Sequence, residues 1–320
     1  MPIYEINESR LNILSEQDLA KLKQKNDIVW IDLNSSETAV SNELEEFLDL
    51  KSLAGDYTNA KLISKSFVEK AGQIFMTSGF FFAGNYKIKL INFIIKNEKL
   101  ITIREDSYNI LENDFTFSSV HHARNDKAIE VLLGIVKNNL ARILEVIEVE
   151  SNNLNDLNNC IVTHCYDKMN LGTKEALKKL GMAGTILSRI EESLASTRRM
   201  ISFLSHTELL ENNNIMRNKL SIILQDIIAL SEQANFLTNK VAFLLDATLG
   251  LINIEQNVTM KTFSVLSVIF MPPTLVATIY GMNFKSMPEL NWGFGYPFSI
   301  LVMIISSSIL VYYFKKKKWW

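Results

Sequence analysis

The stretch FSVLSVIFMPPTLVATIYGMN, residues 263–283, decides the architecture of this chain. Residues 263–280 contain no charged side chain over 18 positions. A helix of that length spans about 27 Å, just enough to cross the hydrocarbon core of a membrane. A second uncharged run of 19 residues, 296–314, follows after a short interval. The two runs predict a membrane hairpin with an external loop over 281–295. The start of the first run and the end of the second then lie on the same side of the bilayer.

The residues after the second run orient this hairpin. Residues 315–320 read KKKKWW, a basic and aromatic tail that is typical of an anchor at the cytoplasmic face of a membrane. Residues 261–320 contain six lysines and one acid and so carry +5; because the whole chain carries −2, residues 1–260 carry −7. The start of the chain lacks the basic and apolar regions of a secretory signal. We therefore predict a multi-pass protein of the cytoplasmic (inner) membrane, with both termini in the cytoplasm and membrane lipid as a partner.

The sequence pattern of residues 1–125 predicts a cytoplasmic α/β domain. Residues 27–33 form a short apolar run that ends in polar residues, as a strand would. Residues 80–104 form the clearest β region. Within it, the apolar runs 93–95 and 100–103 flank a polar tetrapeptide and predict a β-hairpin.

Long helices are predicted after this domain. Apolar residues recur with a helical period at Ile129, Leu132, Leu133, Val136, Leu140, Ile143 and Ile147. We predict long antiparallel helices over 126–212, with the second from about residue 173 to 210, and a stalk helix over 213–280 that continues into the first membrane span. Helices that bury only one face imply bundling, within the chain or between chains. The predicted fold class is an α+β cytoplasmic domain (an α/β sandwich) followed by a long stalk helix and two transmembrane helices.

One face of the first membrane helix is polar, small or flexible. Alternate steps of three and four residues select Asp246, Gly250, Asn253, Asn257, Met260, Ser264, Ser267, Met271, Thr274 and Thr278. These positions form one continuous seam with a seven-residue period, and aliphatic residues such as Val265 and Leu275 lie around it. Two interpretations stay open on periodicity alone: the hydroxyls pack helix against helix, or the seam lines water.

The loop between the two runs carries two short motifs. Gly281-Met282-Asn283 follows the first run, and Met287-Pro288-Glu289-Leu290 precedes the second. Together with GLINIEQN at 250–257 and MPPT at 271–274, they make an ordered set. In these motifs the chain resembles the CorA family of magnesium (cobalt/nickel) transport channels. Lys285 departs from that family, in which an acid is common at this position, so Glu289 is the one carboxylate of the loop.

The resemblance implies a funnel-shaped homopentamer with the first membrane helix inside and the second outside. A single hairpin cannot enclose a pore, so several chains must surround one. Gly281, Met282 and Asn283 would form the selectivity filter, with Asn283 as a ring of amides at the outer mouth and Glu289 in the external loop. The pore lining and gate would comprise Asn257, Met260, Phe263, Ser264, Ser267, Met271, Thr274 and Thr278.

A ring of neutral amides suits Mg²⁺ chemically. This ion demands octahedral oxygen ligands and gives up its water reluctantly, so amide oxygens can accept hydrogen bonds from coordinated water without trapping the ion. Further inside, Met271 and Met260, with Phe263 or Ser264 between them, would narrow the pore and gate it by dewetting. We therefore predict Mg²⁺ as the transported ion, with Co²⁺ and Ni²⁺ as further candidates.

No energy source or catalytic group is predicted. The sequence has no nucleotide-binding Gly-rich loop ending in Lys-Ser/Thr. An inside-negative potential supplies about 2.3 kcal/mol per charge per 100 mV, which is sufficient for passive influx. We predict no enzymatic activity, no covalent cofactor and no nucleic-acid partner.

Two aspartates on the stalk helix are candidates for regulation. Asp246 continues the polar seam below the membrane, and Asp226 lies further toward the cytoplasmic domain. We expect cytosolic Mg²⁺ to bridge these acids between protomers and to hold the pore shut. A solvated helix face is the plain alternative for Asp226.

Two other functions remain as alternatives. A zinc transporter of the ZntB type would share the architecture, but those relatives tend to carry Ile where Met282 stands. A non-transporting membrane scaffold would give no reason for the polar seam. Cys160, His164 and Cys165 are close enough in sequence to hold zinc, although soft residues on a helix are usually incidental.

Overall fold

The computed structural model describes two compact units of the chain. The described residues are 3–7, 10–14, 28–34, 67–70, 72–96, 99–104, 127–162, 173–211, 213–283, 287–288, 292–317 and 319. The N-terminal unit is Met1–Leu244 and the C-terminal unit is Leu245–Trp320.

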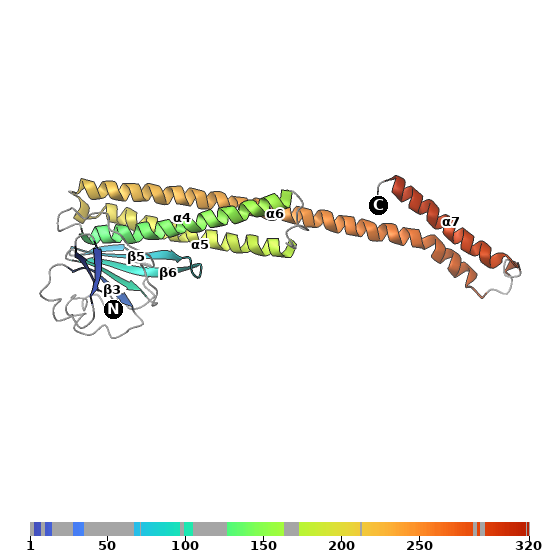
Figure 1. Ribbon diagram of the computed structural model, residues 1–320, viewed down its shortest axis with the longest axis horizontal. Helices are drawn as coiled ribbons and strands as arrows, with labels where there is room; N and C mark the ends of the chain where they lie inside the picture. Colours follow the sequence, from blue (N-terminus) through green and yellow to red (C-terminus); the bar gives the residue numbers. More distant parts are fainter. Residues whose placement is uncertain are drawn as a thin grey trace. The chain divides into compact units, whose positions relative to one another are not determined.

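The N-terminal unit contains a seven-stranded mixed sheet (Figure 1). Its strands are β1 (Ile3–Asn7), β2 (Arg10–Leu14), β3 (Ile28–Asn34), β4 (Phe67–Lys70), β5 (Gln73–Phe82), β6 (Lys87–Lys96) and β7 (Lys99–Arg104). They lie in the order β2-β1-β3-β7-β6-β5-β4, with β3 and β7 parallel and the other neighbours antiparallel. The predicted hairpin is confirmed, because Lys96 pairs with Lys99, and the strand predicted at 27–33 is β3.

A buried charge network joins the two parallel strands at the centre of this sheet. The Asp32 carboxylate of β3 accepts hydrogen bonds from Arg104 Nε of β7 at 2.9 and 3.1 Å, and lies 2.7 Å from Arg104 Nη2. Thr102 Oγ1 donates to Asp32 Oδ1 at 2.7 Å and accepts from Trp30 Nε1 at 3.1 Å. Because the carboxylate is both paired and hydrogen-bonded, it is tolerated in the core.

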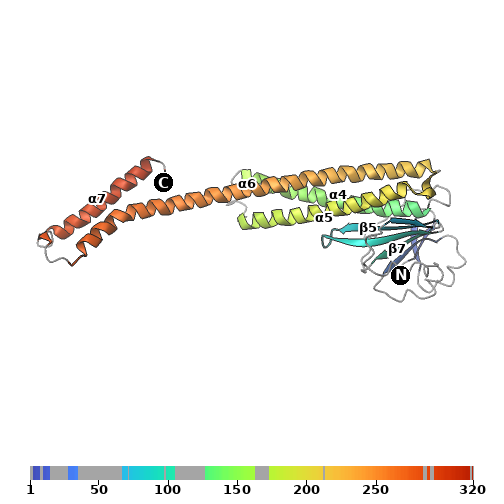
Figure 2. The ribbon, with the colours of Figure 1, turned by 180° about the vertical axis from the view of Figure 1, so that it is seen from behind.

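Two long helices lie along the sheet, α4 (Lys127–Val162) and α5 (Thr173–Ser205), as Figure 2 shows from behind. Contact between α5 and the sheet is made at Gly79 of β5. The Gly79 amide donates to Ser196 Oγ at 2.9 Å, and Ser193 Oγ donates to the Gly79 carbonyl at 2.8 Å. A Cβ atom at this position would lie 2.7 Å from Ile88 Cγ2 of β6, so a larger residue would require the Ile88 side chain or its strand to shift.

The second predicted helix ends earlier than expected. It stops at Ser205 rather than near residue 210, and a short 3₁₀ turn, η6 (Glu208–Leu210), follows. Ser205 Oγ donates to the Ser202 carbonyl at 2.7 Å, and Thr207 Oγ1 donates to the Leu204 carbonyl at 2.8 Å. Side chains that bond nearby carbonyls in this way compete with the backbone ladder, which favours a helix end.

The third helix, α6 (Asn214–Tyr280), is 67 residues long, and its first part packs with α4 and α5. Lys219 pairs with Glu130 near the start of α4, and Lys240 donates to Asn155 near its end, so α4 and α6 run parallel. Thr238 Oγ1 of α6 donates to Glu191 of α5 at 2.9 Å, so α6 also contacts the helix that lies between α4 and α6 in the sequence. The N-terminal unit is therefore a mixed sheet covered by a layer of long helices.

The C-terminal unit holds the remainder of α6 and the helix α7 (Gly295–Lys316). Both helices contain a stretch long and apolar enough to cross a membrane. The predicted fold class, an α+β domain followed by a long helix and a second apolar helix, is confirmed in these elements. Pro272 and Pro273 lie inside α6, and the helix continues through them.

One carboxyl group of α4 is buried on the apolar face of the helix. Glu150 is 8 % exposed and stands in helical register with the buried Ile147 and Leu154. Burial raises the pKa of Glu150 above its ordinary value of 4.5, and a side-chain hydrogen bond with Asn153 partly opposes this effect. The folded chain therefore binds this proton more tightly than the unfolded chain does.

The stability of the chain should depend on the protonation of Glu150. Because the folded-state pKa is raised, stability is lost as the pH rises from 4.5 through the folded pKa. We expect Glu150→Gln to raise the melting temperature at pH 7.5 by several degrees, and to give little gain near pH 4.5. Thermal unfolding followed by circular dichroism at both pH values measures this. Glu148→Gln, on the exposed side of the same helix, is the control; an equal gain at both pH values would contradict the prediction.

Candidate ion-conduction site

The helix α7 packs against one face of α6 within the C-terminal unit. On α6 this face includes Val265, which is buried, and Ile269, which is half-buried. On α7 it includes Ser307, whose hydroxyl reaches the Ile269 carbonyl. Gly295 and Ser299, both buried, lie nearer the start of α7. The contact of Ser307 with the Ile269 carbonyl was not predicted from the sequence, because it depends on how α7 packs against α6.

The two prolines of α6 affect this packing. Pro272 and Pro273 have no amide hydrogen, so the carbonyls of Val268 and Ile269 lose their usual helical donors. Ser307 Oγ of α7 donates to the Ile269 carbonyl in a long hydrogen bond of 3.4 Å. The hydroxyl of α7 thus partly replaces a bond that the proline sequence removes, as polar groups in membrane helices commonly do.

The predicted pore-lining residues all lie on the exposed surface of the single chain. They are Asn257, Met260, Phe263, Ser264, Ser267, Met271, Thr274 and Thr278. At about 100° per residue, positions 264, 267, 271, 274 and 278 point away from the side of Ile269 and hence away from α7. The seam is therefore not used to pack α6 against α7 within one chain.

The hydroxyl groups of the seam bond to their own helix. Ser264 donates to the Met260 carbonyl at 2.8 Å, and Ser267 to that of Phe263 at 2.9 Å. Thr274 and Thr278 likewise donate to the carbonyls four residues earlier, at 2.8 and 2.7 Å. Each hydroxyl proton is thus satisfied, and the oxygen lone pairs remain on the outer surface as hydrogen-bond acceptors. A row of acceptors can receive hydrogen bonds from the water shell of a passing cation.

The motif after α6 lies at the end of the helix. The Gly281 amide donates to the Ala277 carbonyl at 3.0 Å, and the Met282 amide to that of Ile279 at 3.2 Å. A Cβ atom on Gly281 would lie 3.1 Å from the Ala277 carbonyl oxygen, so glycine suits this tight exit. Gly281, Met282 and Asn283 are all exposed. Glu289 and Lys285 lie outside the described residues.

The two candidate regulatory aspartates are exposed on α6, Asp226 in the N-terminal unit and Asp246 in the C-terminal unit. Among the residues that the structure describes, no group of three or more His, Cys, Asp or Glu could hold a metal ion. Cys160 is buried and forms no disulfide, and its proposed companions His164 and Cys165 lie outside the described segments. A metal site on these aspartates would need ligands from another chain or from residues outside the described ranges.

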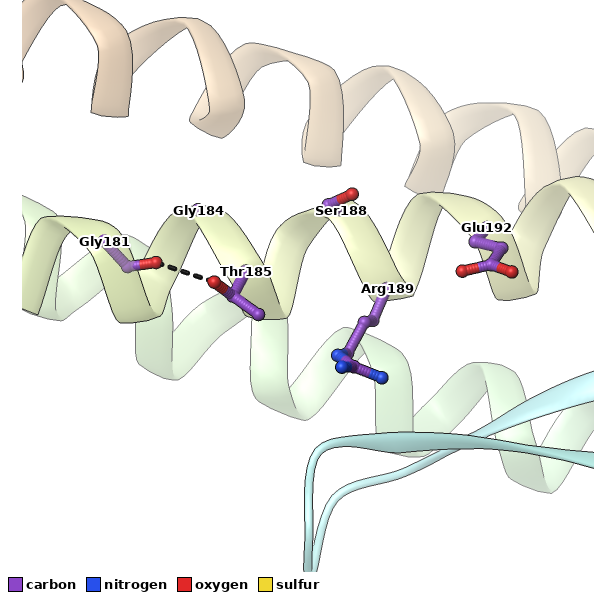
Figure 3. Close-up of a pocket in the computed structure, with 6 residues that line it drawn as sticks. All are labelled: Gly181, Gly184, Thr185, Ser188, Arg189 and Glu192. Atoms are coloured by element: carbon purple, nitrogen blue, oxygen red, sulfur yellow. Dashed lines mark hydrogen bonds between the residues drawn. The ribbon is translucent and has the colours of Figure 1, made fainter.

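A shallow hollow of about 540 Å³ runs along α5 (Figure 3). It is lined by Gly181, Gly184, Thr185, Ser188, Arg189 and Glu192. Its charged groups are one guanidinium and one carboxylate, which is no ligand set for a divalent cation. A Cβ atom on Gly184 would lie 3.6 Å from Val241 Cγ1 of α6, which is an ordinary van der Waals contact, so alanine would fit at this position.

These features define a class of protein. An α+β unit is followed by one long helix, α6, whose last part forms a pair of membrane-type helices with α7. The face of α6 turned away from α7 carries a row of hydrogen-bond acceptors. The family model described as "CorA-like Mg2+ transporter protein" matches residues 25–316. The chain belongs to the CorA family, whose members are ion transporters rather than enzymes, and the predicted resemblance is confirmed.

The relatives match over nearly the whole chain. The magnesium transport proteins CorA of Haemophilus ducreyi and of Escherichia coli K12 are each 32 % identical to it, over 305 and 312 residues, with 94 % of both chains covered. The complete structure of the CorA magnesium transporter of Methanocaldococcus jannaschii is similar in fold, with a TM-score of 0.73 and 17 % identity, over 100 % of this chain and 99 % of that one. The full-length CmaX protein matches with a TM-score of 0.62 and 12 % identity, over 100 % and 98 %.

The position of the seam predicts which side chains water can reach. In a chain with Cys160 and Cys165 replaced by alanine, we expect Thr274→Cys to react with a charged thiol reagent in lipid vesicles. Ile269→Cys, on the α7 side, should be protected, because neither water nor the charged reagent enters that contact. Mass spectrometry of the modified protein measures both. Protection of Thr274→Cys together with labelling of Ile269→Cys would show that the seam does not meet water.

Proposed function

We propose that this chain forms a passive channel for hydrated Mg²⁺ across the cytoplasmic membrane. Membership of the CorA family supports the ion and the class of protein. The observation that carries the proposal is the row of hydroxyl acceptors on the face of α6 that α7 leaves free. A helix that met only lipid on that face would gain nothing from gathering its hydroxyls there.

A pore on this face requires several chains, and we propose a homopentamer. Since α7 occupies the opposite side of α6, copies arranged with α7 outermost would turn their seams toward one axis. The lysines after α7 favour a topology with both termini in the cytoplasm. In that topology Asn283 lies at the outer mouth and Asp246 near the cytosolic end.

Selection is assigned to the motif Gly281-Met282-Asn283. An exposed amide directly after the last turn of α6 can present its oxygen to the axis. A ring of such oxygens would hold the water shell of Mg²⁺ by hydrogen bonds, so that the ion need not lose that shell. Weak binding of this kind allows the ion to leave again, as conduction requires.

Gating is assigned to the large apolar side chains of the seam. Met260 and Met271 are each 66 % exposed in the single chain, and Phe263 is 64 % exposed. Turned toward an axis, these side chains would form rings that exclude water when they close together. The membrane potential supplies about 2.3 kcal/mol per charge per 100 mV, which suffices to drive Mg²⁺ inward through the open pore.

The first experiment measures Mg²⁺ entry into vesicles that contain the purified protein, a trapped Mg²⁺ dye and an inside-negative potential. We expect saturable influx for the unaltered chain. Asn283→Ala should reduce the initial rate about tenfold or more, because every subunit loses its amide at the narrow mouth. Asn235→Ala is the matched control, since this exposed amide lies in the N-terminal unit and donates to the Ser231 carbonyl of its own helix at 2.9 Å.

Other outcomes of this experiment would point to other functions. Entry of Zn²⁺ without Mg²⁺ would favour a zinc transporter. Entry of no divalent ion by the folded oligomer would favour a scaffold. Entry of Co²⁺ or Ni²⁺ beside Mg²⁺ would show that the filter admits hydrated ions of similar size.

Regulation by cytosolic Mg²⁺ is assigned to Asp226 and Asp246. We propose that the ion bridges these carboxylates to neighbouring chains and holds the pore closed, and that like charges repel when the ion leaves. The double variant Asp226→Ala/Asp246→Ala should raise the Mg²⁺ concentration for half-inhibition about fivefold or more. Glu145→Ala, an exposed acid on α4, serves as the control. Unchanged inhibition in the double variant would remove both residues from the regulatory site.

A further inference from the structure

The C-terminal tail folds back at the end of α7. The Lys317 amide donates to the Tyr313 carbonyl at 3.1 Å, and the Trp319 amide donates to the Phe314 carbonyl at 3.1 Å. The second bond spans five residues and so ends the helix with a turn. The indole of Trp319 is thereby brought beside the last turn of α7.

Three aromatic rings form a row at this turn. The rings of Tyr313 and Phe314 meet edge to face at 5.7 Å between centroids, and those of Phe314 and Trp319 stack at 5.9 Å. Phe314 is buried at the centre of the row, whereas Tyr313 and Trp319 remain about half exposed. Tyr and Trp with one apolar side and one wet side are typical of the bilayer interface.

A lysine lies over each outer ring of the row. Lys261 Nζ of α6 is 5.0 Å from the centroid of the Trp319 ring, and Lys317 Nζ is 5.3 Å from that of Tyr313. A cation over an aromatic face is held in position by the ring quadrupole. An ammonium group has three N–H donors, so those turned away from the ring stay available to an anion.

The charge of this region is of one sign. From residue 256 to the end of the chain the sequence contains one acid, Glu289, in the loop between α6 and α7. Lys315 and Lys316 add two further exposed ammonium groups beside the row. Clusters of basic residues at the cytoplasmic end of a membrane helix attract the anionic lipids of that leaflet.

We propose that the row Tyr313-Phe314-Trp319, with Lys261 and Lys317, binds the headgroups of anionic phospholipids in the cytoplasmic leaflet. The phosphate oxygens accept hydrogen bonds from the two ammonium groups, while the outer rings lie at the level of the glycerol. Because Lys261 belongs to α6 and the rings belong to the end of α7, a bound lipid stabilises the contact between the two helices. The inference rests on the membrane topology proposed above and does not require ion conduction.

The test is binding of a fluorescent phosphatidylglycerol to the full chain in a neutral detergent. We expect phosphatidylglycerol to bind more tightly than phosphatidylcholine with the same acyl chains, and to raise the melting temperature. Lys261→Gln and Lys317→Gln should each weaken phosphatidylglycerol binding roughly fivefold, and together about 25-fold. Trp319→Phe should retain most of the affinity. Trp319→Ala should weaken binding about as much as Lys261→Gln does, roughly fivefold.

Controls separate this inference from the proposed channel. Lys240→Gln removes a charge in the N-terminal unit and should leave lipid binding unchanged. Asn283→Ala should bind phosphatidylglycerol normally, even where it no longer conducts Mg²⁺. Equal affinity for the two lipids, or unaltered binding by the double lysine variant, overturns the proposal while leaving the channel in place. Displacement of the lipid by millimolar inorganic phosphate would also overturn it, because the site would then take a free anion.

Discussion

The packing of α7 against one face of α6 constrains what the opposite face can do. Val265 and Ile269 lie on the side of α6 that faces α7, where Ser307 reaches the Ile269 carbonyl, so among the described residues the serines and threonines on the opposite side have no partner helix. A hydroxyl in hydrocarbon must still be hydrogen-bonded, and each of these bonds to the carbonyl four residues earlier. The resulting face presents hydroxyl oxygens as acceptors, while the hydroxyl protons are bonded within the helix. Such a face suits the transient binding of a hydrated ion.

The same helix meets a different environment in each unit. Along the N-terminal unit α6 buries aliphatic side chains, such as Ile223, Ile227 and Leu230, against its neighbours, as a helix in water does. In the C-terminal unit burial of apolar surface between helices gains little, because lipid is equally apolar, and the contact between α6 and α7 includes a hydrogen bond from Ser307 to the Ile269 carbonyl. One 67-residue element therefore follows two packing rules along its length.

The sequence predicted the features that depend on local periodicity. The membrane-type helices, the hairpin of β6 and β7 and the polar seam follow from patterns that neighbouring residues carry. The strand order did not, because the parallel pairing of β3 with β7, which the Asp32–Arg104 network bridges, joins residues about seventy positions apart. The end of α5 at Ser205 was also missed, since side-chain hydrogen bonds there outweigh the apolar pattern that continues to Leu210.

The roles of the candidate site residues stay predictions. The seam that the steps of three and four residues select is exposed on the side of α6 turned away from Ile269, and Asn283 is exposed after the helix end. The ring that these residues are proposed to form lies beyond one chain's sequence, because it depends on contacts between copies. The aromatic row at the C-terminus was predicted only as an interface anchor, since the return of Trp319 to Lys261 requires a turn that the lysine run does not encode.

The adjacent prolines of α6 have a mechanical consequence. A helix resists bending through its ladder of backbone bonds, and Pro272 and Pro273 leave two neighbouring rungs without an amide donor. One of the two carbonyls is held by a long bond from another helix, which stretches or breaks at little cost. Because these two backbone bonds are missing, the physical expectation is that α6 resists bending least between Val268 and Pro273.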